Sequence, residues 1–400
     1  MNAPRSAQAL VDAAQALREP IEAGAAQRDR EREFPLEAMG WVRDAGITAA
    51  RVPLEYGGAG ASFRDLARIM IALSQADPNL AQSLQPHFAL QEALRIVASP
   101  ATQARYFQQM ADGTIITNAL AERGGKFIGD IATQAVRENG GYRLTGTKYY
   151  CTGSFVADAF WVLSGAASAE RLLAIVPADR AGVTIEDDWD AMGQRTTASG
   201  TVTLDNVWVA DDEVMQAAHL WSTRNYVGAA AQLGHAAIDA GIAAAAFREA
   251  LGYARHHGRP LPESGVTRLA DDPYVSATIG DMSVQSVTAT AVVLATADVL
   301  EEAANAQLQT RDMNAQLELA LAQASIAVAE AKIVSSRAAL CNCEQLFQVG
   351  GASMTARKLN FDRHWRNART HTVHDPLSYK FKAIGDFYLN DRYPVIGTKI

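Results

Sequence analysis

Apolar residues recur with helical spacing through the first quarter of the chain. The pattern predicts helices over 7–28, 36–45, 63–76 and 79–97. Ser62 stands where it can cap the third of these helices. A loop rich in Pro and Gly, at 52–60, separates the second helix from the third. The sequence therefore predicts a helical N-terminal domain over residues 1–115.

The pattern changes near Thr114 to short apolar runs that Gly, Pro, Asp and Asn separate. These runs lie at 115–120, 134–137, 142–150, 160–164, 171–176, 183–187 and 200–209. Asn139-Gly140-Gly141 is a turn signal between the second run and the third. Strands at this spacing, without helices between them, predict an antiparallel barrel or sandwich over 116–217.

Helical periodicity returns beyond Ala217 and continues to the end of the chain. Long amphipathic segments cover 227–257, 273–306 and 313–347, and a short one covers 379–390. Long antiparallel helices with apolar stripes form bundles. We therefore expect a helical bundle over 218–400 and a protein that is mainly α with a central β-domain.

The balance of acidic and basic residues limits the kinds of molecule that the protein is expected to bind. The chain has 36 basic and 44 acidic residues, a formal net charge of −8, and 48% hydrophobic residues. This composition argues against nucleic acid or an anionic membrane and suits an enzyme of small molecules. The N-terminus lacks the apolar segment of a signal peptide. No window approaches the roughly 18 apolar residues of a membrane span, so we expect a cytoplasmic protein.

The cysteines indicate neither disulfides nor a metal site. Cys151, Cys341 and Cys343 are too few and too irregularly spaced for a disulfide framework. Cys341 and Cys343 form a C-x-C pair without a second pair, so structural zinc is not expected. We interpret all three as small buried apolar residues.

The densest titratable string of the chain lies at 360–376, where three Arg, three His and two Asp occur among seventeen residues. Buried charge is costly unless it is paired or used, so this string is the first candidate site. His371 and His374 would share a face if the turn between them is helical. Two imidazoles beside Asp375 are acid–base groups that work near neutral pH.

The same three side chains could in principle form an iron site of two His and one carboxylate. Adjacent His and Asp residues rarely converge on one ion, as His374 and Asp375 would have to do. We therefore expect no metal, and metal analysis of the purified protein tests this expectation.

Two strings are Leu-Glu-Tyr-Gly-Gly at 54–58 and Thr-Gly-Thr-Lys-Tyr-Tyr-Cys-Thr-Gly at 145–153. Both resemble the flavoproteins of the acyl-CoA dehydrogenase fold, and the order of segments agrees over nearly the whole chain. That fold hosts several chemistries. Residues 188–200 and the string at 360–376 more specifically resemble the reduced-flavin-dependent monooxygenases of sulfur acquisition, such as dibenzothiophene and methanesulfinate monooxygenases.

The resemblance implies a reaction and its partners. FMN would arrive already reduced, oxygen would add to it as a (hydro)peroxide, and one oxygen atom would pass to a small organosulfur compound. The protein would keep that adduct dry and manage its proton. No G-x-G-x-x-G fingerprint follows a predicted strand, so we expect a separate NAD(P)H:flavin reductase. Family habit further implies a homotetramer.

The resemblance also assigns roles to residues. His371, His374 and His87 would be acid–base groups, with Asp375 orienting an imidazole. The alternative for each histidine is a satisfied, partly buried side chain. The residues expected to bind the flavin are Asn118, Thr152, Trp189, Arg259, Gly350 and Gly351.

Within that set the expected contacts differ. Thr152 would contact the reacting end of the flavin and Trp189 would wall the pocket. Arg259 would hold the phosphate through its planar fork of donors. Gly350 and Gly351 would allow close approach of the flavin tail across a subunit interface. Ordinary turn hydrogen bonds, a solvated Arg and a plain helix-to-helix turn are the alternatives.

An FAD-dependent acyl-CoA dehydrogenase is the second hypothesis. Such an enzyme needs a carboxylate base, which commonly follows a Tyr near the C-terminus as Tyr-Glu-Gly. The matching residues here are Val373-His374-Asp375-Pro376, and the other position for a base, within 220–232, offers no Asp or Glu. A flavin-binding scaffold without chemistry is a third hypothesis, which the dense titratable string disfavours.

Overall fold

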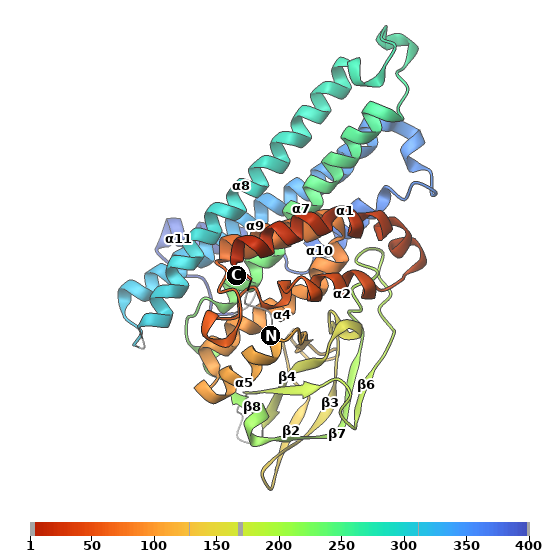
Figure 1. Ribbon diagram of the computed structural model, residues 1–400. Helices are drawn as coiled ribbons and strands as arrows, with labels where there is room; N and C mark the ends of the chain where they lie inside the picture. The colour runs from red at the N-terminus through yellow and green to blue at the C-terminus, as the bar shows by residue number, and fades with distance from the viewer. Residues whose placement is uncertain (1–4, 128, 167–170, 311, 398–400) are drawn as a thin grey trace.

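The computed structural model describes residues 5–127, 129–166, 171–310 and 312–397. Helices come first, a sheet follows, and a bundle of longer helices ends the chain (Figure 1). The N-terminal helices are α1 (Ala7–Glu31), α2 (Leu36–Asp44), α3 (Phe63–Ala76), α4 (Pro78–Val97) and α5 (Pro100–Ala111). The four predicted helices are confirmed, and α5 adds a fifth within the same part of the chain.

Sharp local signals set the boundary between α3 and α4. Ser62 and Asp65 form a capping box at the start of α3. Asp77 ends α3, and its side chain accepts a hydrogen bond from the Asn79 amide at the start of α4. Pro78 occupies the first turn of α4, where the missing N–H is harmless. The chain therefore turns sharply into α4, which is buried over 78–94.

The described part of the central domain forms one eight-stranded sheet. Its strands are β1 (Ile116–Ala119), β2 (Gln134–Glu138), β3 (Gly141–Lys148), β4 (Ala159–Ala166), β5 (Arg171–Pro177), β6 (Val183–Ile185), β7 (Val202–Ala210) and β8 (Val214–Gln216). The order is β6-β7-β3-β2-β4-β5-β8, and β1 pairs with β4. The pairing is mostly antiparallel, as predicted, but β1 and β2 both run parallel to β4.

The C-terminal domain is a helical bundle with two short helices folded back on it. Its helices are α6 (His219–Ser222), α7 (Val227–His256), α8 (Pro273–Gln309), α9 (Ala315–Gly350), α10 (Asp362–Thr372) and α11 (Leu377–Asn390). Small residues allow close packing between the helices. At Gly241 of α7, a Cβ would lie 2.5 Å from the Ser74 side chain of α3.

The expectation that no window approaches a membrane span is wrong for α8. Over Pro273–Gln309 this helix is long and apolar enough to cross a membrane by length and composition alone, with a hydropathy of 1.4 in its best window. In that window 33% of the residues are buried inside the chain. Val284 and Val287 lie on the uncovered side, at 62% and 65% exposure.

Figure 1 shows α4 between the sheet below and the long helices above. This placement puts one buried helix in contact with both domains.

Candidate active site

The candidate site lies where α4, the loops of the sheet and the C-terminal bundle meet. On α4, the Gln82 side chain reaches His371 of α10, with Oε1 3.2 Å from Nε2. The next residue, Ser83, faces the sheet domain, because a Cβ on Gly153 would lie 2.6 Å from its carbonyl oxygen. Consecutive residues of α4 therefore join the histidine string to the loop at 149–153.

His371 is buried in the last turn of α10 and anchored on a carboxylate of α7. Its Nδ1 donates to Asp239 Oδ1 at 2.5 Å. The other carboxylate oxygen, Oδ2, accepts from Lys332 Nζ and Ser336 Oγ of α9, both at 2.6 Å. Burial alone would raise the pKa of Asp239, but the charge of Lys332 and the bond to His371 outweigh it and hold that pKa well below its usual range. Asp239 is therefore a buried anion with three partners.

A second imidazole, His235 of α7, follows in the row. Its Nδ1 is 3.1 Å from His371 Nε2, and its ring centroid is 4.5 Å from that of His374. Burial, and then the neighbouring charges of His374 and His371, lowers the pKa of His235 well below its ordinary value. His235 is therefore a neutral imidazole between two others.

His374 is the solvent-facing end of this row, with its side chain 46% exposed. The condition for His371 and His374 to share a helical face is not met, because α10 ends at Thr372. Each of the two rings instead lies beside His235, with centroids 5.1 Å from it for His371 and 4.5 Å for His374. We call His371, His235 and His374 the imidazole row.

Asp375 is buried and lies beside His374. His374 Nδ1 is 3.1 Å from Asp375 Oδ2, and Gln232 Nε2 donates to the same oxygen at 2.6 Å. Burial would raise the pKa of Asp375, but the His374 bond and the nearby charges of His374 and Lys380 lower it. Asp375 is thus placed to orient His374, while Asp239 has that relation to His371.

His87 of α4 is held apart from the imidazole row. Its Nδ1 accepts from the Ile116 amide at 3.1 Å, so Nε2 carries the proton and donates to the Thr48 carbonyl at 2.9 Å. Burial lowers its pKa to about 4. Both ring nitrogens are engaged by backbone groups, and proton transfer at His87 would first require one of these bonds to break.

Three of the residues expected to bind a cofactor gather around the loop at 149–153. Asn118 Nδ2 donates to the Tyr150 carbonyl at 3.1 Å. The Trp189 ring lies edge-on to the Tyr150 ring at 6.0 Å. Thr152 Oγ1 is 2.9 Å from Ser199 Oγ. One loop therefore brings Asn118, Thr152 and Trp189 together.

Unpaired polar atoms line the same loop region. Among the described residues, Asn118 Oδ1, Thr196 Oγ1 and both side-chain polar atoms of Gln194 are buried without a hydrogen-bond partner. Tyr150 and Gln194 also have left-handed φ angles of 57° and 53°. Buried unpaired groups and strained backbone concentrate at functional sites. The lining fits a planar ligand with donors and acceptors on its edge.

Family models match the three domains in order. They are the acyl-CoA dehydrogenase N-terminal domain over residues 5–114, the middle domain over 118–207 and the C-terminal domain over 233–379. A dibenzothiophene monooxygenase from Mycolicibacterium goodii is 31% identical over 385 residues, covering 93% of this chain and 91% of the relative. The chain belongs to the dibenzothiophene monooxygenase branch of the acyl-CoA dehydrogenase family.

Other members of this branch agree with the assignment. A probable FMNH2-dependent monooxygenase from Pseudomonas putida, SfnC, is 31% identical over 380 residues, 92% of each chain. The FMN-bound crystal structure of TdsC from Paenibacillus sp. A11-2 superposes with a TM-score of 0.91 at 29% identity, covering 98% of this chain and 100% of that one. Methanesulfinate monooxygenase MsuC from Pseudomonas fluorescens gives 0.88 at 29% identity, over 98% and 99% of the two chains.

The other expected cofactor residues of this dibenzothiophene monooxygenase relative lie at the far end of the bundle. Arg259 is exposed in the link between α7 and α8. At Gly350, the last residue of α9, a Cβ would lie 2.6 Å from the Tyr253 ring of α7. Tyr253 follows His235 by 18 residues on one helix, a distance of roughly 27 Å at about 1.5 Å per residue. One chain therefore does not bring Arg259, Gly350 and Gly351 to the imidazole row.

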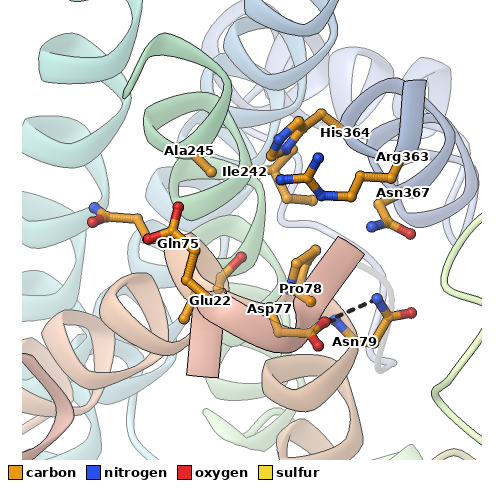
Figure 2. A pocket seen from close by; sticks show the side chains of 13 residues that line it. Glu22, Gln75, Asp77, Pro78, Asn79, Ile242, Ala245, Arg363, His364 and Asn367 are labelled. Carbon is orange, nitrogen blue, oxygen red and sulfur yellow. Dashed lines mark hydrogen bonds between the residues drawn. The ribbon is translucent and has the colours of Figure 1, made fainter. Parts of the chain in front are cut away.

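The first half of the string at 360–376 is paired within the fold. Arg363 and His364 both bind Glu249 Oε2, at 2.7 and 2.8 Å. Burial opposes ionisation of Glu249, but His364 and Arg363 lower its pKa to about 2. Figure 2 shows Arg363, His364 and Asn367 facing Asp77 and Asn79 across a small pocket. Through Glu249 of α7, Arg363 and His364 fasten α10 to the bundle.

Sequence reasoning missed Asp239, His235, Lys332 and Gln82. A signal was present for the first two, because His235 and Asp239 are four residues apart in an Ala-rich apolar helix and so share a face. Lys332 likewise lies in a stretch of α9 that is rich in Ala, Ile and Val, with Glu330 and Arg337 as its nearest charged neighbours in the sequence. A charge on an apolar helix predicts a buried partner, although its identity depends on packing between helices.

Proposed function

We propose that this protein is a two-component, reduced-FMN-dependent monooxygenase that transfers one oxygen atom to a small organosulfur compound. The observation that carries the proposal is the buried imidazole row beside a loop lined with unpaired polar atoms. Membership of the branch that includes dibenzothiophene monooxygenase, SfnC and MsuC supports it.

The residues around the loop at 149–153 fit FMN. The unpaired atoms of Asn118, Gln194 and Thr196 would bond to polar groups on the edge of the isoalloxazine ring. Trp189 would wall the ring, and Thr152 would offer a hydroxyl beside it. When bound, reduced FMN supplies the electrons that activate oxygen for transfer to sulfur.

The protein contributes proton control and exclusion of water. His371 Nδ1 is committed to Asp239, so Nε2 is the nitrogen that can take or give a proton. His235 and His374 connect this nitrogen towards solvent, while His235, His371 and Gln82 are themselves buried. Proton exchange can therefore occur without opening the site to bulk water.

The same geometry disfavours the acyl-CoA dehydrogenase alternative. The carboxylates beside the imidazole row are Asp239 and Asp375, and their partners hold both pKa values low. A carboxylate with a depressed pKa is a poor base for removing a weakly acidic α-proton. Of the groups described at this site, the imidazoles of the row therefore remain as the candidates for proton exchange.

We further propose that a separate NAD(P)H:flavin reductase in the cytoplasm supplies the reduced FMN. Exposed apolar side chains on α8 and α11, including Val287 at 65% and Leu389 at 84%, support assembly into a homotetramer. In that assembly Arg259, Gly350 and Gly351 of one subunit would hold the FMN phosphate end at the imidazole row of another.

The test is oxygen-dependent turnover of a panel of sulfones, sulfoxides, sulfinates and thiophenes with a flavin reductase, FMN and NADH. We expect ¹⁸O from ¹⁸O₂ in the product, and no product when the reductase is left out. Reduction of a bound FAD by an acyl-CoA, with no oxidation of any organosulfur compound, would instead establish the dehydrogenase.

A further inference from the structure

The contacts of Asp239 divide between its two oxygens. Oδ2 accepts from Lys332 and Ser336, each at 2.6 Å, and Oδ1 accepts from His371 Nδ1 at 2.5 Å. The side chains of Asp239 and Lys332 have no exposed surface. With Oδ2 saturated from α9, the carboxylate can present only Oδ1 to α10.

We propose that Asp239 and Lys332 are positioning residues for His371. Asp239 fixes the tautomer with its proton on Nδ1, and Lys332 neutralises the carboxylate so that His371 rests uncharged with Nε2 ready to gain a proton. This inference rests on the proposed function for what His371 does with that proton, whereas the tautomer and the resting charge are properties of the protein alone.

The charges around His371 favour a neutral imidazole, which is the resting state that the proposal requires. From α7 it faces Asp239 and neutral His235, from α9 Lys332, and from the segment after α10 His374. Asp375 and Lys380 lie one contact further out, around His374 and His235. Asp239 and Lys332 cancel as a buried ion pair, which leaves no net negative charge to hold an imidazolium at His371.

Nε2 of His371 has a partner for either protonation state. In the neutral ring, His235 Nδ1–H can donate to it at 3.1 Å. In the charged ring, Nε2–H can donate to Gln82 Oε1 at 3.2 Å. A proton can therefore pass from His235 Nδ1 to His371 Nε2 without movement of the heavy atoms, because His235 Nδ1 then becomes an acceptor.

The direct measurement is the titration of His371 by NMR in protein labelled on its histidine rings, with the signal assigned through a His371→Gln variant. In the wild-type protein we expect a neutral ring with the Nδ1–H tautomer from pH 6.5 to 8. A neutral ring with the proton on Nε2 overturns the proposal without any positioning variant.

Two variants move the charge in opposite directions. Lys332→Met leaves Asp239 uncompensated, so the His371 titration should move up by at least one pH unit and the acid limb of the kcat profile should follow it, with KM little changed. Asp239→Asn should move the titration down and mix the tautomers. A folded Lys332→Met protein whose His371 titrates as in the wild type overturns the proposal.

Lys148→Met is the matched control. Lys148 is also a fully buried lysine, paired with Glu122 at 2.5 Å in the sheet domain. Its removal should destabilise the protein while leaving the titration of His371 unchanged, and an equal shift in both lysine variants contradicts a specific effect of Lys332. Because NMR reads the ring directly, lack of activity on every organosulfur compound would refute the proposed function without touching this result.

Discussion

Solvent exposure separates His374 from the other two members of the imidazole row. Its side chain is 46% exposed, whereas His371 and His235 are 3% and 4% exposed. His374 is therefore the position from which a proton would enter the row. It is also the histidine that can be replaced with the least effect on packing.

We expect His374→Ala to lower kcat roughly 100-fold, the usual contribution of a positioned acid–base group, with the fold intact. Turnover of the organosulfur substrate with reductase and FMN measures this, and circular dichroism checks the fold. His219→Ala is the control, because His219 is an exposed histidine at the start of α6, outside the residues assigned to the site. Equal kcat values for the His374 variant and the wild type would remove this residue from proton transfer.

His87 makes a prediction about stability. Burial lowers its pKa to about 4 from the usual 6.5, so the unfolded chain binds more protons between these values. The stabilisation by neutral His87 is complete above pH 6.5 and is lost as the pH falls towards 4. The shift corresponds to about 3 kcal/mol of unfolding free energy.

Urea unfolding at pH 7.5 and pH 4.5 tests this expectation. The wild-type protein should lose more stability between the two values than His87→Gln does, by about 2–3 kcal/mol. His235, His364 and His371 also have lowered pKa values, but they are common to both proteins and cancel in the comparison. Equal losses would mean that His87 does not stay neutral in the folded chain.

At the scale of elements, the contact between α4 and the loop at 149–153 decides how the flavin-binding region is placed. Gly153 has a φ of 81°, and a Cβ there would lie 2.6 Å from the Ser83 carbonyl. Both the left-handed backbone and the close approach require glycine. Any larger residue must move the loop away from α4.

Gly153→Ala should therefore weaken FMN binding at least tenfold. The left-handed conformation costs an alanine about 1–2 kcal/mol, and the clash with α4 displaces Thr152 next to it. Fluorescence titration with FMN measures the affinity. Gly140→Ala is the control, because Gly140 also has a left-handed backbone, with a φ of 76°, but a Cβ there meets nothing within 4 Å. A matching FMN affinity in both variants would contradict the assignment of this loop.

Long elements with a clear hydrophobic period could be predicted from the sequence. Short elements, and features that depend on contacts between elements, could not. The predicted helix at 227–257 ends within one residue of α7, because a 30-residue apolar periodicity leaves little choice. Strand β8 has only three residues and was not predicted. The end of α10 at Thr372 carries no strong stop signal until Pro376, so the sequence left open whether His374 lies on the helix.

The candidate site could likewise be predicted only in part. The string at 360–376 was recognisable from its density of charge. Which of its side chains form ion pairs and which can exchange protons depends on their contacts with α7 and α9. Asp239 and Lys332 are 93 residues apart in the chain and meet only through helix packing. No local pattern contains such a pair.

At the scale of the whole molecule, the proposed flavin contacts lie at two ends of one bundle. The imidazole row contacts α4 through Gln82, while Arg259 follows the C-terminal end of α7 and Gly350 ends α9. Figure 1 shows α7 running away from the sheet. A single FMN cannot reach both ends within one chain. If Arg259 holds the phosphate, it must belong to a neighbouring subunit.

This arrangement predicts complementation between two inactive variants. Arg259→Ala should weaken binding of reduced FMN by about 1.5–3 kcal/mol, the value of a charged hydrogen bond, and His374→Ala should remove proton transfer. In a mixed assembly, a site formed by His374 of an Arg259→Ala chain and Arg259 of a His374→Ala chain is complete. Co-expression with two affinity tags and tandem purification isolates such assemblies, and turnover at limiting FMN should exceed that of either variant alone. If Arg259 served its own chain, every site in the mixture would carry one defect, and activity would equal the average of the two parents.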